Sequence, residues 1–236
     1  TFESKRMKPL TRMYGFFDGE DVTKYCVPKL LEITMKSGTF QVGEKVIGTV
    51  ITNWSGGPGP TRTFYGRVAQ SNHKEGPYNA ATKIYPESPY DGQSIPASYS
   101  SSSSILNIDL LSLSAEAQGE YYGYVETDMT LKGESSGAEA TITDLRLISD
   151  IGADLFGSYY IPDPNNTNHP RFQTGTKTFT LVDDPDNNQD EANTVSEEAY
   201  TASGTMETVQ ENIISVRNAR LEQRQEFQER NVNRSL

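Results

Sequence analysis

The chain has few of the residues from which cross-linked or metal-binding sites are built. Cys26 is the single cysteine, which excludes an intrachain disulfide and a cysteine-based zinc site and is compatible with assembly in a reducing cytoplasm. The two histidines, His73 and His169, lie in stretches rich in proline and asparagine. Neither has a second histidine, a cysteine or a spaced carboxylate pair nearby. We therefore interpret both histidines as exposed loop residues.

Basic residues and long apolar runs are also scarce. Lys and Arg number 21 against 32 Asp and Glu, and the net charge of −11 argues against a nucleic-acid-binding surface. No run of about 18 apolar residues is present, so no membrane insertion is expected. Hydrophobic residues make up only 34% of the chain, which predicts a thin core or one completed by partner subunits.

Catalytic motifs are missing as well. The chain has no G-x-S-x-G, and the Gly/Pro loop at 55–60 lacks the Lys-Ser/Thr of a phosphate-binding loop. Carboxylate pairs such as Glu116 with Glu120, or Glu126 with Asp128, would suit a glycosidase, but carboxylates are common on solvated surfaces. We therefore expect a protein that is not an enzyme, with no catalytic, cofactor-binding or metal residue and no cofactor.

An acidic segment at 183–198 holds seven Asp and Glu and no Lys or Arg. Asp184, Asp186 and Asn188 have the spacing that begins an EF-hand loop, but Gln189 and Val195 stand where Gly and a bidentate Glu are required. The segment is therefore interpreted as a solvated linker, with an irregular surface cation site as the alternative.

What is abundant favours β-structure. The chain has 13 Tyr, 19 Gly and 12 Pro, with clusters of Ser, Thr and Asn. The clearest pattern runs over 121–150, where alternating apolar residues on both sides of the Gly-rich turn at 132–137 predict an antiparallel hairpin. Asp18-Gly19 predicts another turn. Further strands are expected within 39–51 and over 61–69, 105–113 and 176–182.

These elements predict an all-β protein with one or two β-sandwich modules, long surface loops and an extended C-terminal arm. We divide it into an N-terminal hairpin region (1–36), a main sandwich region (37–182), an acidic linker (183–199) and the arm (200–236). Within the arm, 205–216 fits either a strand or a helix. We favour a strand followed by a short exposed helix.

A long polar loop at 71–104 interrupts the main region. Loops of this length are uncommon unless they are functional or disordered, and its tyrosines predict that it packs on a surface. We take these tyrosines as candidate contacts with a receptor or partner: Tyr78, Tyr85, Tyr90 and Tyr99. The clusters at 121–124 and 159–160 also suit a sugar or a partner, although alternation along a strand would place about half of those rings in the core.

Seven stretches, which together span most of the chain, carry a resemblance to a known family. They are FFDGEDVTKYC (16–26), SGTFQVGEKVIGT (37–49), RVAQSNHKEGPYNAATKIYPESPYD (67–91), IPASYSSSSSILNIDLLSLS (95–114), YYGYVETDMTLKGESSGAEATITDLRLISD (121–150), LFGSYYIPDPNNTNHPRFQTGTKTFTL (155–181) and ASGTMETVQENIISVRNAR (202–220). In their order and extent these stretches resemble large virion structural proteins of contractile-tailed, T-even-like phages of marine cyanobacteria.

The resemblance implies a segment of a long protein made of serial β-modules in the tail, baseplate or tail fibre, which functions in tail assembly and host attachment in the virion. It carries over no catalytic residue. It implies other tail or baseplate proteins as partners and, for a fibre, a homotrimer. The candidate assembly residues lie in the arm: Ile213, Ile214, Val216, Leu221 and Phe227. The alternatives are a module that binds host cell-surface glycan and, more weakly, a polysaccharide-degrading tailspike-type enzyme.

Overall fold

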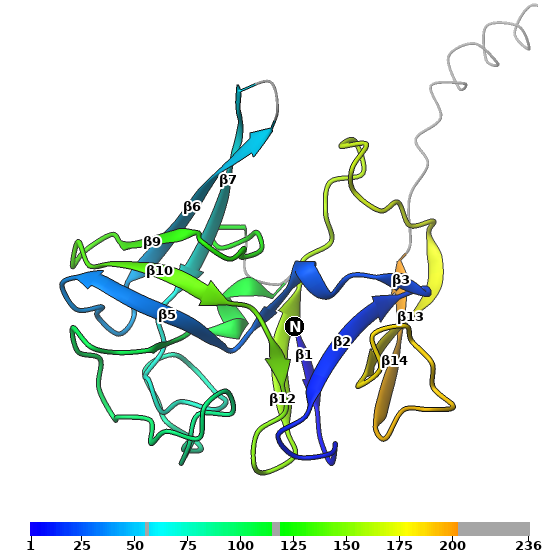
Figure 1. The fold of residues 1–236 in the computed structure, drawn as a ribbon, viewed down its shortest axis with the longest axis horizontal. Coiled ribbons are helices and arrows are strands. Elements are labelled where there is room, and N and C mark those ends of the chain that lie inside the picture. Colours follow the sequence, from blue (N-terminus) through cyan, green and yellow to red (C-terminus); the bar gives the residue numbers. More distant parts are fainter. Residues whose placement is uncertain (55–56, 115–118, 203–236) are drawn as a thin grey trace, which may run out of the picture. The chain divides into compact units, whose positions relative to one another are not determined.

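The computed structural model describes residues 1–54, 57–114 and 119–202, and this part of the chain is all-β (Figure 1). Its strands are β1 (Phe2–Ser4), β2 (Arg12–Phe17), β3 (Glu20–Asp21), β4 (Cys26–Pro28), β5 (Leu30–Ser37), β6 (Lys45–Trp54), β7 (Gly57–Arg67), β8 (Ile105–Asn107), β9 (Thr130–Gly133), β10 (Glu139–Asp144), β11 (Leu147–Ile148), β12 (Leu155–Tyr159), β13 (Gly175–Val182) and β14 (Val195–Ala202). Two short 3-10 helices accompany them, η1 (Thr23–Tyr25) and η2 (Leu110–Leu113). The predicted fold class is confirmed for this part; the predicted helix of the arm lies outside the described residues.

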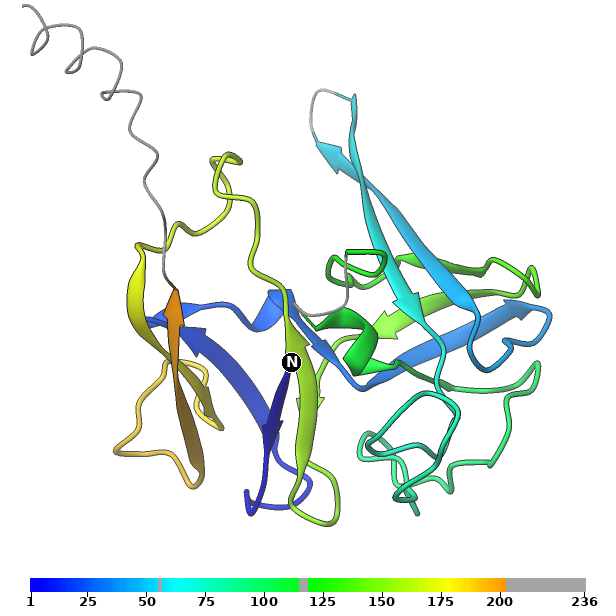
Figure 2. The same ribbon diagram turned by 180° about the vertical axis from the view of Figure 1, so that it is seen from behind.

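The strands form three sheets. One curls into a half-barrel with the order β7-β6-β9-β10-β5-β8, a second has the order β1-β12-β4, and a third has the order β11-β2-β13-β14 with β3 paired to β2. Figures 1 and 2 show the half-barrel on one side of the described part and β2, β13 and β14 on the other, with β1 and β12 between them. The β6–β7 hairpin projects beyond its shorter neighbour β9.

Lys29 marks the point where the chain passes from one sheet to the next. It is the only residue between β4, which pairs with β12, and β5, which pairs with β8. Its N–H donates to the Phe156 carbonyl at 3.2 Å, and its carbonyl accepts from the Ile108 N–H at 2.9 Å. The two sheets therefore share one almost continuous strand, and Lys29 is anchored to both.

Two main apolar cores result from this arrangement. The larger lies inside the half-barrel and includes Leu31, Val46, Phe64, Met129 and Leu131, each fully buried. The smaller combines residues of the other two sheets, such as Met13 of β2 and Leu155 of β12. Alternation along each strand thus directs its apolar residues to one side, as a sandwich-like fold requires.

The hairpin predicted within 121–150 is present but shorter. β9 and β10 pair antiparallel around the Gly-rich turn, whereas 125–129 precede the strand. A buried carboxylate, that of Glu44, fastens the turn by accepting from the N–H groups of Ser135 at 3.1 Å and Ser136 at 2.9 Å. The predicted turn at Asp18-Gly19 is also present, with positive φ at both residues, and joins β2 to β3.

Two predicted elements differ from the structure. The strand expected over 105–113 ends at Asn107, and the chain turns into η2. There the hydroxyl of Ser112 donates to the Asp109 carbonyl at 2.6 Å, a local bond that competes with strand pairing. In the acidic segment, 183–194 join β13 to its neighbour β14, and 195–199 belong to β14. This stretch therefore connects two strands of one sheet instead of forming a linker. The other predicted boundaries stay predictions.

Five threonines form one row across the half-barrel. Thr63, Thr49, Thr130, Thr141 and Thr34 are successive cross-strand partners on β7, β6, β9, β10 and β5. All five are exposed or half-buried, on the face opposite the core. Their β-branched side chains support strand geometry, while their hydroxyls remain near solvent.

Candidate functional site

The four tyrosines of the loop at 71–104 fasten it to the body of the protein. Tyr85 and Tyr99 are buried, with 4% and 9% of their surface exposed. The Tyr90 hydroxyl donates to the Leu30 carbonyl, and the Tyr78 ring packs against Gly43. The loop is therefore packed on the surface, as its tyrosines predicted. The rings of Tyr85 and Tyr99, however, point inward and are not displayed to a receptor.

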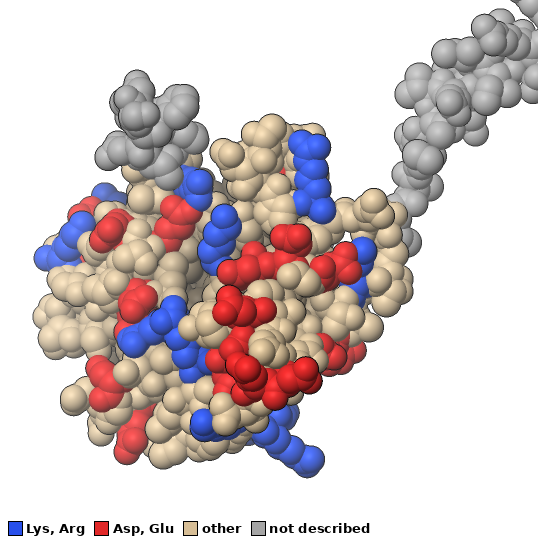
Figure 3. All heavy atoms as spheres, turned by 45° about the vertical axis from the view of Figure 1, so that its right-hand side comes forward, with Lys and Arg blue, Asp and Glu red and all other residues tan. Residues whose placement is uncertain are grey.

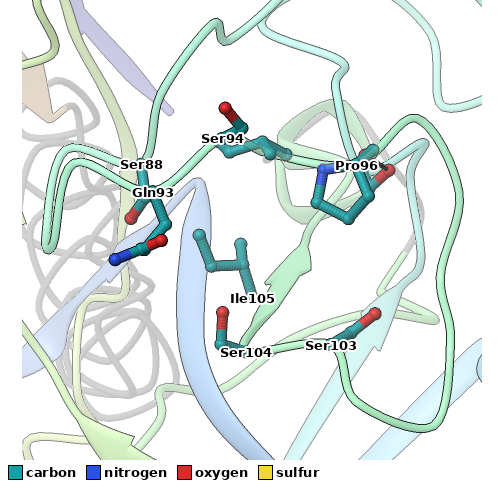
Figure 4. A pocket seen from close by; sticks show the side chains of 9 residues that line it. Ser88, Gln93, Ser94, Pro96, Ser103, Ser104 and Ile105 are labelled. Atoms are coloured by element: carbon teal, nitrogen blue, oxygen red, sulfur yellow. Dashed lines mark hydrogen bonds between the residues drawn. The ribbon is translucent and has the colours of Figure 1, made fainter.

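Figure 4 shows a pocket at the base of this loop, with Ser88, Gln93 and Ile105 on its walls. Its volume is about 20 Å³, room for roughly one water molecule. It is too small for a sugar ring, so we do not assign it as a ligand site.

An alternating stack of tyrosines and cations lies beside β6 and β7. We call it the tyrosine–cation ladder, and its members are Tyr65, Lys45, Tyr121, Arg67 and Tyr78. The Lys45 Nζ lies 4.9 Å from the Tyr65 ring centre and 5.6 Å from that of Tyr121. The Arg67 Cζ lies 4.8 Å from the Tyr121 ring centre and 4.9 Å from that of Tyr78. Each cation thus interacts with two rings.

Strand register builds this ladder. Lys45 and Arg67 are direct cross-strand partners on β6 and β7, with side chains on the outer face. Tyr65 and Tyr122 exchange backbone hydrogen bonds of 2.9 and 3.0 Å, which holds the segment with Tyr121 along the edge of β7. The tyrosines at 121–124 were recognisable in the sequence. Their cationic partners were not, because they come from strands more than 50 residues earlier.

Hydrogen bonds fix the ladder further. The Arg67 Nε and Nη2 donate to the Tyr121 hydroxyl at 3.2 and 3.1 Å. This hydrogen bond raises the pKa of the Arg67 guanidinium, so the ladder keeps its positive charge at any physiological pH. The neighbouring Tyr122 ring is 49% exposed and lies 5.0 Å from that of Tyr65. The ladder therefore ends in an aromatic surface open to solvent.

A second aromatic group is centred on Tyr124. Its ring lies 5.0 Å from that of Tyr25 and 5.8 Å from that of Tyr160, and its hydroxyl accepts from Arg62 at 2.7 Å. Burial raises the pKa of Tyr124 to about 12. Arg62 also pairs with Glu126, one of the carboxylates that would suit a glycosidase. The Glu126 carboxylate is thus engaged by a guanidinium, and Glu116 of the other pair lies outside the described residues.

The histidines and the cysteine do not form a reactive site in the described part of the chain. His73 has 0% of its surface exposed, so its assignment as an exposed loop residue was wrong: the loop folds back and encloses it. His169 is partly exposed and packs edge-on against Tyr25. Burial raises the pKa of the Cys26 thiol far above its ordinary value, which leaves it unreactive. In the described part of the chain, no group of three or more His, Cys, Asp or Glu is placed to hold a metal ion.

Acidic side chains gather elsewhere, on the side formed by the sheet with β2 and β13 (Figure 3). Exposed members of this group are Asp18, Glu20, Asp21, Glu197 and Glu198. Within 183–194, the Asp183 and Asp184 carboxylates accept backbone N–H groups of their own loop. The acidic residues thus shape a loop and solvate one face, apart from the strands that carry the ladder.

The candidate assembly residues Ile213, Ile214, Val216, Leu221 and Phe227 lie outside the described residues. Among the residues that are described, no helix is long and apolar enough to cross a membrane.

Comparisons with protein-family models, curated proteins and solved structures return no match for this chain.

Proposed function

We propose that the chain is a non-enzymatic structural segment of a phage virion, located in the tail, baseplate or tail fibre, where it contributes to assembly and host attachment. The resemblance of seven stretches, in order, to structural proteins of cyanophage tails supports this proposal. The strongest structural support for this proposal is the outer edge of β14, the last strand of its sheet.

β14 is an eight-residue strand at the end of its sheet, and most of its side chains are exposed. In the described part of the chain, no strand pairs with its outer edge. An unpaired edge offers a row of N–H and C=O groups that a strand of another subunit can complete. Such an edge is a natural attachment point in an assembly of serial β-modules. The partners we propose are further copies of the chain, as a homotrimer, and other tail or baseplate proteins.

Location in the virion is the first test. An antibody fragment raised against residues 79–84, which are all exposed, is bound to intact virions and imaged by electron cryomicroscopy. We expect extra density on the tail, baseplate or fibres, and its symmetry gives the copy number. Density on the head, or none on the particle, would reject the assignment.

The tyrosine–cation ladder favours a second candidate function, the binding of host cell-surface glycan. Tyrosine offers a large ring face with few rotatable bonds, which suits stacking against a sugar ring. Lys45 and Arg67 add positive charge that would attract acidic sugars in an otherwise acidic protein. The exposed ring of Tyr122 is the specific observation behind this candidate.

Binding of the purified chain to host cell envelopes tests the second candidate. Tyr122→Ala should reduce binding at least fivefold, if a sugar ring stacks on the tyrosine about as strongly as a nucleic-acid base does, at about 1–3 kcal/mol. Tyr14→Ala is the matched control, because Tyr14 also lies beside an arginine, Arg12 at 5.4 Å, but on another sheet. Equal binding of both variants would remove the glycan function and leave the structural one intact.

A further inference from the structure

Two buried lysines line one cavity, and they differ in their partners. Lys29 is 4% exposed and Lys74 is 8% exposed. The Lys74 Nζ lies 2.6 Å from a carboxylate oxygen of Asp150 and 3.0 Å from one of Asp154. Burial lowers the pKa of Lys74, but these two carboxylates outweigh it and the pKa is raised. Lys74 is therefore a protonated structural lysine.

The amine of Lys29 forms no ion pair of this kind among the described residues. Its Nζ donates to the Ile108 carbonyl at 2.8 Å, and among the described residues no carboxylate forms an ion pair with it. A buried ammonium group without an ion-pair partner is destabilised relative to the neutral amine. Burial accordingly lowers the pKa of Lys29 to about 7, against the opposing charge of Asp109.

The ionisable groups around Lys29 do not restore the ordinary pKa of its amine. Asp109, at the start of η2, is the carboxylate that opposes the shift, and burial raises its own pKa. His73 has a pKa lowered to about 4, first by burial and then by the charge of Lys29, so it is neutral at pH 7. Glu3 and Glu75, on the cavity wall, pair with Lys5 and Lys83 instead.

Lys29 is one of the residues that line a cavity. It is an open depression of about 590 Å³, within the range of small-molecule sites. Four apolar side chains contribute to its walls: Phe2, Leu110, Leu111 and Phe156. Leu111 is 56% exposed, as expected for a residue at the rim of such an opening.

We propose that Lys29 is a covalent binding site for small apolar aldehydes or ketones, which it holds as an imine. The nitrogen lone pair attacks the carbonyl carbon, and a proton moves from nitrogen to oxygen to give a carbinolamine. Solvent protonates the carbinolamine hydroxyl, which leaves as water while the nitrogen lone pair forms the C=N bond. The nitrogen then returns its remaining proton to solvent, so one amine and one carbonyl yield one imine and one water. No oxidant or reductant is involved. The apolar walls receive the body of the ligand.

Reductive trapping tests this site in the full chain. The protein is treated at pH 7 with butanal and sodium cyanoborohydride, which reduces an imine to a stable secondary amine, and modified lysines are located by peptide mass spectrometry. About half of Lys29 is neutral at this pH, against roughly one part in 2,500 for an ordinary lysine. We expect Lys29 to be modified at least tenfold faster than Lys74 and than exposed lysines such as Lys132. Glyoxylate, a small aldehyde without an apolar body, should label Lys29 less than butanal does, because it cannot pack against the apolar walls.

The pH profile provides the second readout. Labelling of Lys29 should rise to half its maximum near pH 7, whereas that of Lys132 should still be rising above pH 9. Lys29→Met should abolish the fast labelling without altering the rates at Lys132, and unfolding the wild-type chain in urea should equalise Lys29 and Lys132. Labelling of Lys29 that is no faster than that of Lys74 in the folded protein would overturn the proposal.

Discussion

At the scale of single residues, the buried polar side chains differ in whether their hydrogen bonds are satisfied. Glu44, His73 and Asn107 have between 0% and 6% of their surface exposed. Glu44 has its hydrogen bonds satisfied, whereas both ring nitrogens of His73 lack a hydrogen-bond partner among the described residues. A satisfied buried carboxylate stabilises the fold, and an unsatisfied buried imidazole makes it sensitive to acid.

Replacing Glu44 should weaken the half-barrel. Its carboxylate accepts from the Gln41 N–H at 2.6 Å, from the Ser135 and Ser136 N–H groups, and from the Ser136 hydroxyl at 2.8 Å. Glu44→Ala leaves these donors without their acceptor, so we expect a loss of about 2–3 kcal/mol in the free energy of unfolding, measured in urea.

The exposed Glu134, on the same turn, is the control for this experiment. Glu134→Gln should change the free energy of unfolding by less than about 0.5 kcal/mol. Similar losses for Glu44→Ala and Glu134→Gln would show that the turn is not held by the buried carboxylate.

His73 should make the protein less stable in mild acid. Its folded-state pKa of about 4 lies below the unfolded value of about 6.5, so the unfolded chain binds the extra proton. This contribution to stability is complete above pH 6.5 and is lost as the pH falls towards 4. Because His73→Phe removes the titrating group, its urea midpoint should fall less between pH 7 and pH 5 than that of the wild type.

His169→Gln should retain the acid sensitivity of the wild type, because it leaves His73 in place. If the wild type and His73→Phe lose the same stability between the two pH values, other groups account for the acid response.

At the scale of elements, the loop at 71–104 is a packed unit held by its tyrosines. The Tyr99 hydroxyl donates to the Ala69 carbonyl at 2.5 Å and accepts from the Asn107 N–H at 3.1 Å. It thereby ties the loop to the residues after β7 and to β8. A loop held at a few buried points should open locally when one of them is removed.

Tyr99→Phe should expose the loop to protease. The variant loses one donor and one acceptor to buried backbone groups, at a cost of about 1–3 kcal/mol. We expect trypsin to cleave after Lys83, in the exposed part of the loop, at least fivefold faster than in the wild type. Tyr14→Phe, on another sheet, should leave this rate unchanged. An unchanged rate for Tyr99→Phe would mean that another contact controls loop opening.

Some strands and turns could be predicted from local sequence patterns, and others could not. The hairpin of β9 and β10 and the turn at Asp18-Gly19 were predictable, because alternation and turn preference are properties of adjacent residues. The segment at 105–113 alternates equally well, yet only three of its residues form a strand. After Asn107, Ile108 forms only an isolated bridge with Val68, and the Ser112 hydroxyl then makes a local turn bond.

At the scale of the whole molecule, the homotrimer proposed for a fibre predicts self-association. We expect the 236-residue chain to sediment as a trimer and its melting temperature to rise with protein concentration. Phe227→Asp, in the candidate assembly segment, should reduce both effects. Ile84→Asp is the control, because Ile84 is 65% exposed in the loop. A monomer with cooperative, concentration-independent unfolding would contradict the prediction.

The sequence by itself determined the strand-rich fold class, the Gly-rich turns and the packed state of the long loop. Each follows from residue types and spacings within about 30 residues. The tertiary structure alone decided that His73 is buried, that Lys45 and Arg67 lie between tyrosines, and that Lys29 lines a cavity and has no ion-pair partner among the described residues. These features depend on strand register and on the passage of one chain between two sheets, which bring together residues distant in sequence.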